Sequence, residues 1–103
     1  MRLEWTEPAL DDLEALRDHI AQDSPVNATR FIERLFDAAD KLPDQPRLGR
    51  KVPEADDTPE EIRELIFRSY RILYRPLNDR VQVIAVVHGG RDLAKAKNKP
   101  WGD

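Results

Sequence analysis

The sequence predicts an α+β domain with the element order β-α-α-β-β-β, in which a helix hairpin packs on one face of a small antiparallel sheet. Apolar residues recur at spacings of three and four up to residue 42, which indicates amphipathic helices, and at a spacing of two after residue 61, which indicates strands. Helices and strands that are segregated along the chain in this way are typical of α+β folds. The length of 103 residues suits a single domain, 1–103, with one core.

The chain begins with a short predicted strand over 1–5, in which Leu3 and Trp5 share one side. A helix follows, with Thr6 as its N-cap and Pro8 in its first turn, where the missing N–H would have no partner. We expect it to end near Gln22. Its apolar stripe consists of Ala9, Leu13, Leu16 and Ile20. Its acidic residues are expected to point away from that stripe: Asp11, Asp12, Glu14 and Asp18.

A second helix is predicted to begin at Ser24-Pro25, an N-cap followed by a proline at the first helical position. Pro43 closes it. Its stripe is wider than the first and consists of Ala28, Phe31, Ile32, Leu35, Ala39 and Leu42. Because about two residues join the helices, they should form an antiparallel hairpin that covers a sheet.

Residues 43–61 are predicted to form a long loop, because they hold four of the eight prolines. A loop of this length is unusual inside a small domain. It indicates a functional or mobile segment, with a simple solvated connection as the alternative.

Three strands are predicted after the loop, over 62–67, 70–75 and 80–88. Only Arg68-Ser69 separates the first two, and Asn78-Asp79 supplies a turn before the third, so the strands should form an antiparallel meander. Alternation on the middle strand places Tyr70, Ile72 and Tyr74 on one face. It places Arg71, Leu73 and Arg75 on the other. One face of the sheet is therefore expected to be apolar and the opposite face partly basic.

The last strand is rich in β-branched residues and apolar on both sides, which favours a central position in the sheet. Alternation puts Val81, Val83, Ala85 and Val87 on one side and Ile84 and Val86 on the other. The strand ends at Gly89-Gly90, where we expect positive φ and a sharp turn. The predicted core contains Leu13, Leu16, Ile20, Phe31, Leu35, Ile72, Val83 and Val87.

Composition excludes several classes of protein. The longest uninterrupted apolar run, 83–87, is far shorter than the ~20 residues of a membrane helix, and the N-terminus has no secretory signal. The absence of cysteine excludes a disulfide scaffold and thiolate chemistry. Neither a paired-histidine metal site nor a phosphate-binding glycine loop is present, so we expect no metal and no cofactor. A cytoplasmic location fits these features.

Charge is distributed unevenly along the chain. Residues 1–61 contain 8 Lys+Arg against 16 Asp+Glu, whereas residues 62–103 contain 9 against 4. The second half, which includes a basic C-terminal tail over 94–103, could therefore present a positive surface to an anionic partner. A general coat of charged residues on a soluble fold is the alternative. The candidate target-binding residues are Arg71, Arg75, Arg91, Lys95 and Lys97.

Four local patterns carry a resemblance that covers nearly the whole chain. They are Trp5-Thr-x-x-Ala9-x-x-Asp12-Leu13, Leu48-Gly-Arg-x-Val-Pro53, Ile62-Arg-Glu-Leu65 followed by Tyr70-Arg-Ile-x-Tyr74, and Val87-His-Gly-Gly-Arg-Asp-Leu93. In this order and at these spacings, they resemble the RelE/ParE superfamily of type II toxin–antitoxin toxins. The ending His88-x-x-Arg91-Asp92-Leu93 is similar to the ParE pattern.

The two branches of that superfamily imply different functions. A ParE-like toxin arrests growth by poisoning DNA gyrase, belongs to a plasmid-stabilisation type of system, and is neutralised by a cognate antitoxin, here a ParD-like ribbon-helix-helix protein. Contact with DNA would then arise only through the antitoxin complex. A RelE-like toxin is instead a ribosome-dependent mRNA endoribonuclease, and a third possibility is an inactive binding module of the same fold.

The ribonuclease alternative names its own candidate residues. In the RelE pattern, arginines at positions matching Arg63 and Arg91 would bind the scissile phosphate, and a tyrosine follows in a C-terminal helix. Residues 94–103 contain no tyrosine, which favours the ParE branch. Metal-independent RNA cleavage needs a base, an acid and cations within a few ångströms. His88 could serve as the base, with Tyr74 in support, if the strand registers allow. The alternatives are that His88 hydrogen-bonds a loop carbonyl and that Arg91-Asp92 is an ion pair that holds the turn.

Overall fold

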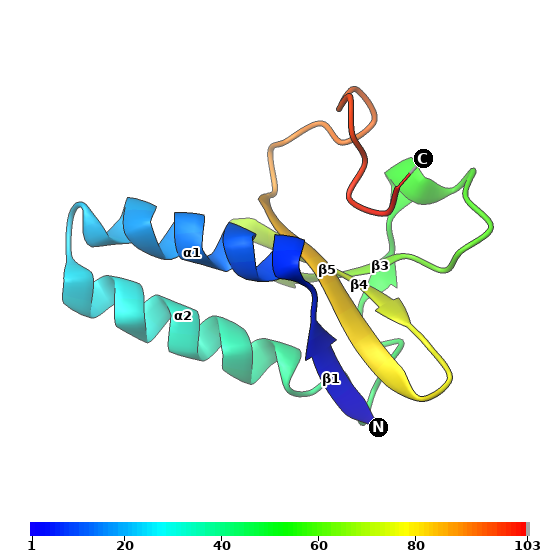
Figure 1. The fold of residues 1–103 in the computed structure, drawn as a ribbon, viewed down its shortest axis with the longest axis horizontal. Helices are drawn as coiled ribbons and strands as arrows, with labels where there is room; N and C mark the ends of the chain where they lie inside the picture. Colours follow the sequence, from blue (N-terminus) through cyan, green and yellow to red (C-terminus); the bar gives the residue numbers. More distant parts are fainter. Residues whose placement is uncertain (103) are drawn as a thin grey trace.

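The computed structural model describes residues 1–102 and contains two helices packed on one face of a five-stranded sheet (Figure 1). In chain order the elements are β1 (Arg2–Trp5), α1 (Glu7–Ala21), α2 (Pro25–Ala39), β2 (Arg50–Lys51), the 3-10 helix η1 (Pro53–Ala55), β3 (Arg63–Phe67), β4 (Tyr70–Pro76) and β5 (Arg80–His88). The predicted α+β class and element order are confirmed. Asp103, the last residue of the predicted tail, lies outside the described residues.

The strand order is β1-β5-β4-β3-β2, so the apolar strand β5 lies inside the sheet as predicted. The antiparallel meander is present as β3, β4 and β5. β1 pairs with β5 in parallel, however, which makes the sheet mixed. Parallel strands require a long crossover connection, and the helix hairpin is part of the one between β1 and β5. The two-residue strand β2 was not predicted, because so short a segment has no detectable period.

Both helices begin at the predicted caps. The Thr6 hydroxyl accepts a hydrogen bond from the N–H of Ala9 at 3.3 Å, and the Ser24 hydroxyl accepts one from Asn27 at 3.2 Å. The two helices then run antiparallel beside each other (Figure 1). α2 ends at Ala39, before the predicted Leu42, which nevertheless remains fully buried.

The main core lies between the helices and the sheet. Its buried members are Ala9, Leu13, Leu16, Leu35, Ala39, Leu42, Ile72, Tyr74, Val81, Val83 and Val86. Ile20 and Phe31, both predicted core residues, are partly buried against it. Trp5 packs edge-on against Phe36 with ring centroids 5.0 Å apart, which joins β1 to α2. The helix hairpin is therefore anchored to the sheet by both aliphatic and aromatic contacts.

The predicted position of Val87 in this core is wrong. Leu73 on β4 pairs with Ala85, but its neighbour Tyr74 pairs with Val83, so Ile84 is an extra residue in β5. Such a β-bulge reverses the alternation of the side chains that follow it. Val86 therefore faces the helices, and Val87 faces the other way.

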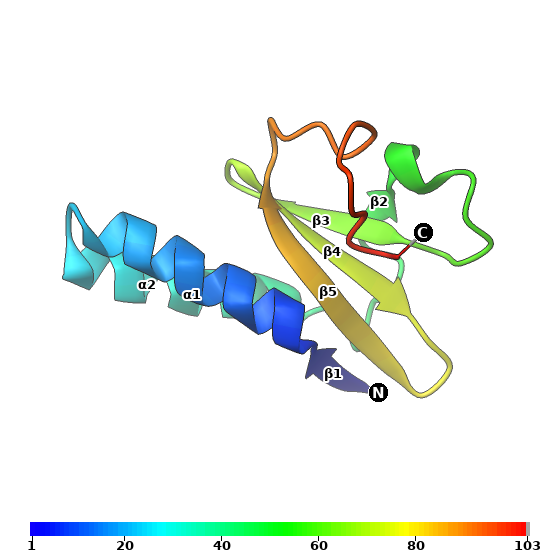
Figure 2. The ribbon, with the colours of Figure 1, turned by 45° about the horizontal axis from the view of Figure 1, so that its top comes forward.

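A second apolar cluster covers the sheet face opposite the helices. It contains Val52, Ala55, Ile62, Leu73, Ile84, Ala85, Val87, Leu93 and Trp101. In Figure 2 the C-terminal tail crosses this face and meets the segment around η1. The long predicted loop and the tail thus cover this face of the sheet. The prediction of a single core is wrong, because the apolar residues form two clusters, one on each face. No helix within residues 1–102 is long and apolar enough to span a membrane.

Truncation of Leu35 tests the main core. Leu35 on α2 is completely buried, so Leu35→Ala should lower the free energy of unfolding by about 2–5 kcal/mol through lost burial and a cavity. Val26 on the same helix is 66% exposed, and Val26→Ala should change the free energy of unfolding by less than about 0.5 kcal/mol. Urea denaturation of both variants measures the difference, and equal midpoints would show that the hairpin is not part of the core.

Candidate functional site

The residues of the motifs in 48–53 and 62–74 meet in one network that ties the long loop to the sheet. The hydroxyl of Tyr74 accepts a buried hydrogen bond from the N–H of Gly49 at 2.9 Å. The guanidinium of Arg63 donates to the Gly49 carbonyl at 2.8 Å and also pairs with Glu61. A side chain at Gly49 would place its Cβ 2.2 Å from the carbonyl oxygen of Glu64. Glycine is therefore required where the loop crosses β3.

A buried carboxylate lies at the centre of the same network. Glu64 on β3 is only 1% exposed, and it accepts hydrogen bonds from Arg71 on β4 and, at 2.8 Å, from Arg50 on β2. Arg71 also donates two hydrogen bonds to Glu54 on η1, at 2.9 and 3.0 Å. The pairing of Glu64 with two guanidiniums compensates for its burial. Arg71 is 6% exposed and is fully occupied by these contacts.

The pKa shifts in this network follow from its contacts. Hydrogen bonds from Arg71 lower the pKa of Glu54 below 4.5. The pKa of Glu61 is lowered chiefly by the hydrogen bond from Arg63, and also by the one from Arg47. Burial opposes both shifts. The pKa of Arg71 is raised, chiefly by its hydrogen bonds to Glu54. Burial raises the pKa of the Tyr74 hydroxyl. Tyr74 therefore stays protonated near neutral pH.

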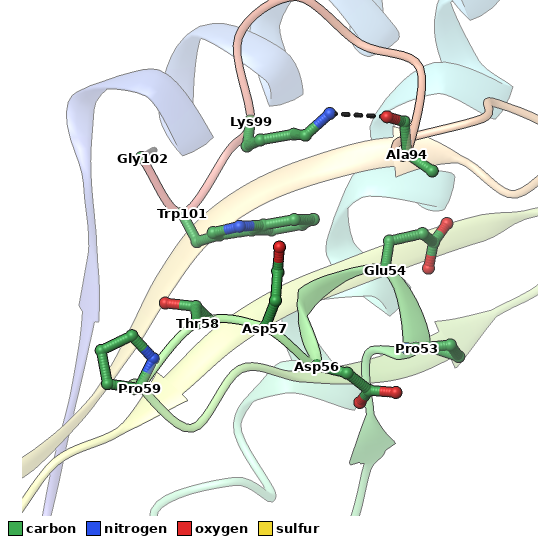
Figure 3. A pocket seen from close by; sticks show the side chains of 10 residues that line it. All are labelled: Pro53, Glu54, Asp56, Asp57, Thr58, Pro59, Ala94, Lys99, Trp101 and Gly102. Carbon is green, nitrogen blue, oxygen red and sulfur yellow. Dashed lines mark hydrogen bonds between the residues drawn. The ribbon is translucent and has the colours of Figure 1, made fainter.

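The tail is fastened to the sheet through Arg75. Its guanidinium donates to the backbone carbonyl of Trp101 at 2.8 Å and contacts Gln82 at 3.4 Å. Its Nε lies 3.2 Å from a carboxylate oxygen of Glu60 but forms no aligned hydrogen bond. The side chain of Trp101 lies over Asp57 and Thr58 in a pocket of about 600 Å³ (Figure 3). Arg75 therefore has a structural role, because it holds the C-terminal tail on the sheet.

A hydrogen bond to α1 supports the end of β5. β1 pairs with β5 only up to Val83, and Asp12 on α1 accepts a hydrogen bond from the exposed edge at the N–H of Val86, at 2.9 Å. Burial raises the pKa of Asp12, while this hydrogen bond and the charge of Arg91 oppose the shift. Asp12 was expected to point away from the apolar stripe of α1, but its carboxylate reaches the sheet and accepts the hydrogen bond of an N–H that β1 leaves unpaired.

The turn after β5 differs from the predicted one. Neither Gly89 nor Gly90 has a positive φ. Gly89 instead permits a close approach to the β3–β4 turn, because its N–H donates to the Ser69 carbonyl at 2.7 Å and an added Cβ would lie 3.1 Å from that oxygen. The Nδ1 of His88 accepts a hydrogen bond from the N–H of Gly90 at 3.1 Å. His88 thus caps the turn, which leaves its Nε2 for other contacts.

Arg91 and Asp92 do not pair with each other. Asp92 accepts a hydrogen bond from the N–H of Ala94 at 3.0 Å and lies 4.0 Å from the ammonium group of Lys95. Within residues 1–102, Arg91 forms no ion pair, and it is exposed. Its guanidinium is therefore available to a ligand.

The candidate residues of the ribonuclease alternative are not close together. Arg63 pairs with Tyr74 and His88 pairs with Tyr70, positions four residues apart along β4. At ~3.3 Å per residue this separates Arg63 from His88 by about 13 Å along the strand. Arg63 is moreover engaged by Glu61 and Gly49.

The predicted target-binding residues fall into two groups. Arg71 and Arg75 lie with Leu73 on the sheet face opposite Ile72 and Tyr74, as predicted, but internal contacts hold both guanidiniums, so they are not free to bind a target there. Arg91, Lys95 and Lys97 are exposed. Arg91 and Arg71 do share a groove of about 440 Å³ with Arg50 and Arg68, two arginines that were not among the predicted target-binding residues. Within residues 1–102, no group of three or more His, Asp or Glu side chains is placed to hold a metal ion.

Comparison with known proteins agrees with this architecture. Residues 3–93 match the family model of the ParE toxin of the type II toxin-antitoxin system parDE. Toxin RelE2 of Caulobacter vibrioides is 38% identical over 88 residues, which are 84% of this chain and 93% of that protein. A solved chromosomal ParDE TA system from P. aeruginosa has a TM-score of 0.71 and 21% identity, over 85% of this chain and 95% of that one.

The helix hairpin on a mixed sheet, together with the matches to the family model and to Toxin RelE2, defines a toxin of the RelE/ParE superfamily. Within it, the chain belongs to the ParE toxin family of type II toxin–antitoxin systems. A type II system pairs a toxin with an antitoxin, so an antitoxin is the partner that this membership implies.

Removal of one hydroxyl tests the structural role of Tyr74. Tyr74→Phe leaves the buried N–H of Gly49 without its partner, which should lower the free energy of unfolding by about 1–3 kcal/mol. Tyr70 is the matched control, because its hydroxyl forms no hydrogen bond within residues 1–102. Tyr70→Phe should change stability by less than about 0.5 kcal/mol. A chemical denaturation series compares the two, and equal losses would argue against the Gly49 contact as the cause.

The lowered pKa values of Glu54 and Glu61 predict acid destabilisation. The unfolded chain binds more protons than the folded chain at these groups, so their contribution is complete above about pH 4.5 and is lost as pH falls through the lower folded pKa. The raised pKa of Asp12 acts in the opposite direction. Glu54→Gln should therefore reduce the loss of unfolding free energy on acidification, measured by urea denaturation across this pH range.

The exposed Glu33 provides the control, because it forms no ion pair within the described part of the chain. Glu33→Gln should leave the pH dependence as it is in the parent protein. A Glu54→Gln variant with the parent's slope would mean that the Arg71 contact does not contribute to acid stability.

Proposed function

We propose that this toxin inhibits DNA gyrase and is neutralised by a ParD-like ribbon-helix-helix antitoxin. It would act in the cytoplasm, arrest growth, and contact DNA only through the antitoxin complex. The observation that carries this proposal is the match of residues 3–93 to the ParE family model, which includes the ending His88-x-x-Arg91-Asp92-Leu93.

The geometry of the polar residues supports gyrase inhibition over RNA cleavage. A metal-independent ribonuclease needs its base, acid and cations within a few ångströms of one phosphate. Here Arg63 lies about 13 Å along the strand direction from His88. The hydroxyl of Tyr74 is buried against Gly49, and Arg71 is saturated by two carboxylates. A protein that acts by binding has no such requirement for convergent groups.

Arg91, Lys95 and Lys97 are the target-binding residues that we propose. All three are exposed and lie on the segment after β5. The charge of Lys95 is only loosely engaged, at 4.0 Å from Asp92. Arg71 and Arg75 could bind the target only if their internal contacts opened, so we assign structural roles to these two arginines.

RelE-like mRNA cleavage is the second candidate function. The name of the Caulobacter relative, Toxin RelE2, favours it at 38% identity. Arg63, His88 and Arg91 would then be the catalytic candidates. They would require a substrate that spans the distance between β3 and the end of β5, or a rearrangement of the loop that holds Arg63. An inactive module with the same fold would have neither activity.

Purified protein tests the choice between these functions. We expect the chain to inhibit gyrase supercoiling or to trap cleaved DNA, and Arg91→Ala to weaken this effect several-fold, because rim charges contribute about 0.2–1 kcal/mol each. Arg17 on α1 is the control, since it is exposed and lies on another element. Arg17→Ala should inhibit gyrase as the parent does.

A parallel assay with programmed ribosomes follows mRNA cleavage. Cleavage that depends on Arg63 and His88, with gyrase unaffected, would establish the RelE-like function in place of our proposal. Absence of both effects, together with normal growth on expression without antitoxin, would identify an inactive module.

A further inference from the structure

The groove at the end of the sheet has a composition that no internal contact fully explains. Four arginines line it, Arg50, Arg68, Arg71 and Arg91, against a single carboxylate, that of Glu54. Glu54 is already paired with Arg71. The buried carboxylate of Glu64 pairs with Arg50 and Arg71, so within residues 1–102 the charges of Arg68 and Arg91 remain unbalanced along the groove.

Arg50 is held in a fixed orientation toward solvent. Its Nε donates to the buried carboxylate of Glu64 at 2.8 Å, while 65% of its side chain is exposed. Its two terminal nitrogens form no hydrogen bond within residues 1–102. A guanidinium that is anchored on one edge and free on the other loses little entropy on binding a carboxylate.

Arg68 occupies a backbone position that suits glycine better. Its φ is +53° in the two-residue turn between β3 and β4, a conformation that costs a non-glycine residue free energy. Its guanidinium lies over the rings of Phe31 and Phe67, 5.8 and 5.6 Å from their centroids. Arg68 therefore holds a positive charge in a fixed place at the tip of the β3–β4 hairpin, on the rim of the groove. A glycine there would relieve the strain but remove this charge.

The groove also has an apolar component. Ile66 on β3 is 55% exposed, although it lies in a strand whose neighbours are at least partly buried. Pro53 contributes a second apolar surface. An exposed isoleucine among arginines is suited to a segment that carries both carboxylates and an apolar side chain.

We propose that this groove, lined by Arg50, Arg68, Arg91 and Ile66, binds an acidic segment of the cognate antitoxin, with an apolar side chain of that segment packed on Ile66. The proposal rests on the proposed function only for the identity of the partner. Charge complementarity supports a peptide: its carboxylates would pair with Arg68 and Arg91, which form no ion pair within residues 1–102, and would accept hydrogen bonds from the free terminal nitrogens of Arg50. Nucleic acid is less suited, because the one aromatic residue that lines the groove, Tyr70, already packs edge-on against Phe31 and His88, and because the groove contains the carboxylate of Glu54.

Peptide titration with the full chain tests the groove directly. The probe is a fluorescein-labelled peptide of alternating Glu and Asp around one Leu, and fluorescence anisotropy measures its binding at low and moderate salt. We expect binding that weakens with salt. Ile66→Asp should reduce the affinity by about tenfold or more, since it removes the apolar contact and adds a like charge. Arg50→Gln should reduce it by about threefold.

The control variant makes the same chemical change elsewhere. Val26→Asp replaces an exposed apolar residue of α2 that does not line the groove, and it should bind the probe as the parent does. Thermal unfolding checks that each variant is folded. Unchanged affinity in both Ile66→Asp and Arg50→Gln, or an equal loss in Val26→Asp, would overturn the proposal.

Two further arms identify the partner. If a single-stranded oligonucleotide binds more tightly than the acidic peptide at equal salt, the groove binds nucleic acid and the proposal of a peptide ligand is overturned. In co-expression, Ile66→Asp should weaken co-purification with the antitoxin, and retention equal to that of Val26→Asp would overturn the antitoxin as occupant. Gyrase inhibition is measured separately, so its failure would leave the peptide result intact and affect only the proposed function.

Discussion

The buried carboxylate of Glu64 constrains most of the sheet face opposite the helices. A charge at 1% exposure is costly unless it is paired and hydrogen-bonded, and Glu64 meets this requirement through Arg71 and Arg50. Arg71 in turn recruits Glu54, which fixes η1 over the sheet. This carboxylate therefore helps to place the strand β2, the loop and the 3-10 helix, together with the contacts of Gly49 to Tyr74 and Arg63 and the burial of Val52 and Ala55.

This arrangement changes what the arginines can do. Arg63, Arg71 and Arg75 alternate on strands in a pattern typical of a surface that binds anions, yet each is engaged by a carboxylate or a carbonyl of the same chain. Charges that remain available lie elsewhere, on the segment after β5 and along the groove at the hairpin tip. Asp12 and His88 hold the backbone of β5 and of the turn that follows it in place.

Much of the fold was accessible from local patterns, but part of the candidate site was not. Thr6 and Ser24 cap the helices as predicted, and the Arg68-Ser69 turn joins β3 to β4. Glu64 was missed because it was read as one member of an alternating strand; its position opposite arginine-bearing strands was the available signal. Trp101 lies near the end of a polar tail, and nothing local indicates that it is buried.

The sequence by itself determined the helices, the three long strands and their order, because these depend on periodicity, caps and turn residues within a few positions of one another. Tertiary structure alone decided the parallel pairing of β1, the bulge at Ile84 and the two apolar layers. The tertiary structure also decided which arginine and lysine side chains have no partner within the described residues. The physical reason is that these features depend on register and ion pairing between residues far apart in the chain, as between Arg71 and Glu54 or Arg75 and Trp101. A one-residue change of register moves side chains to the opposite face, and composition does not record it.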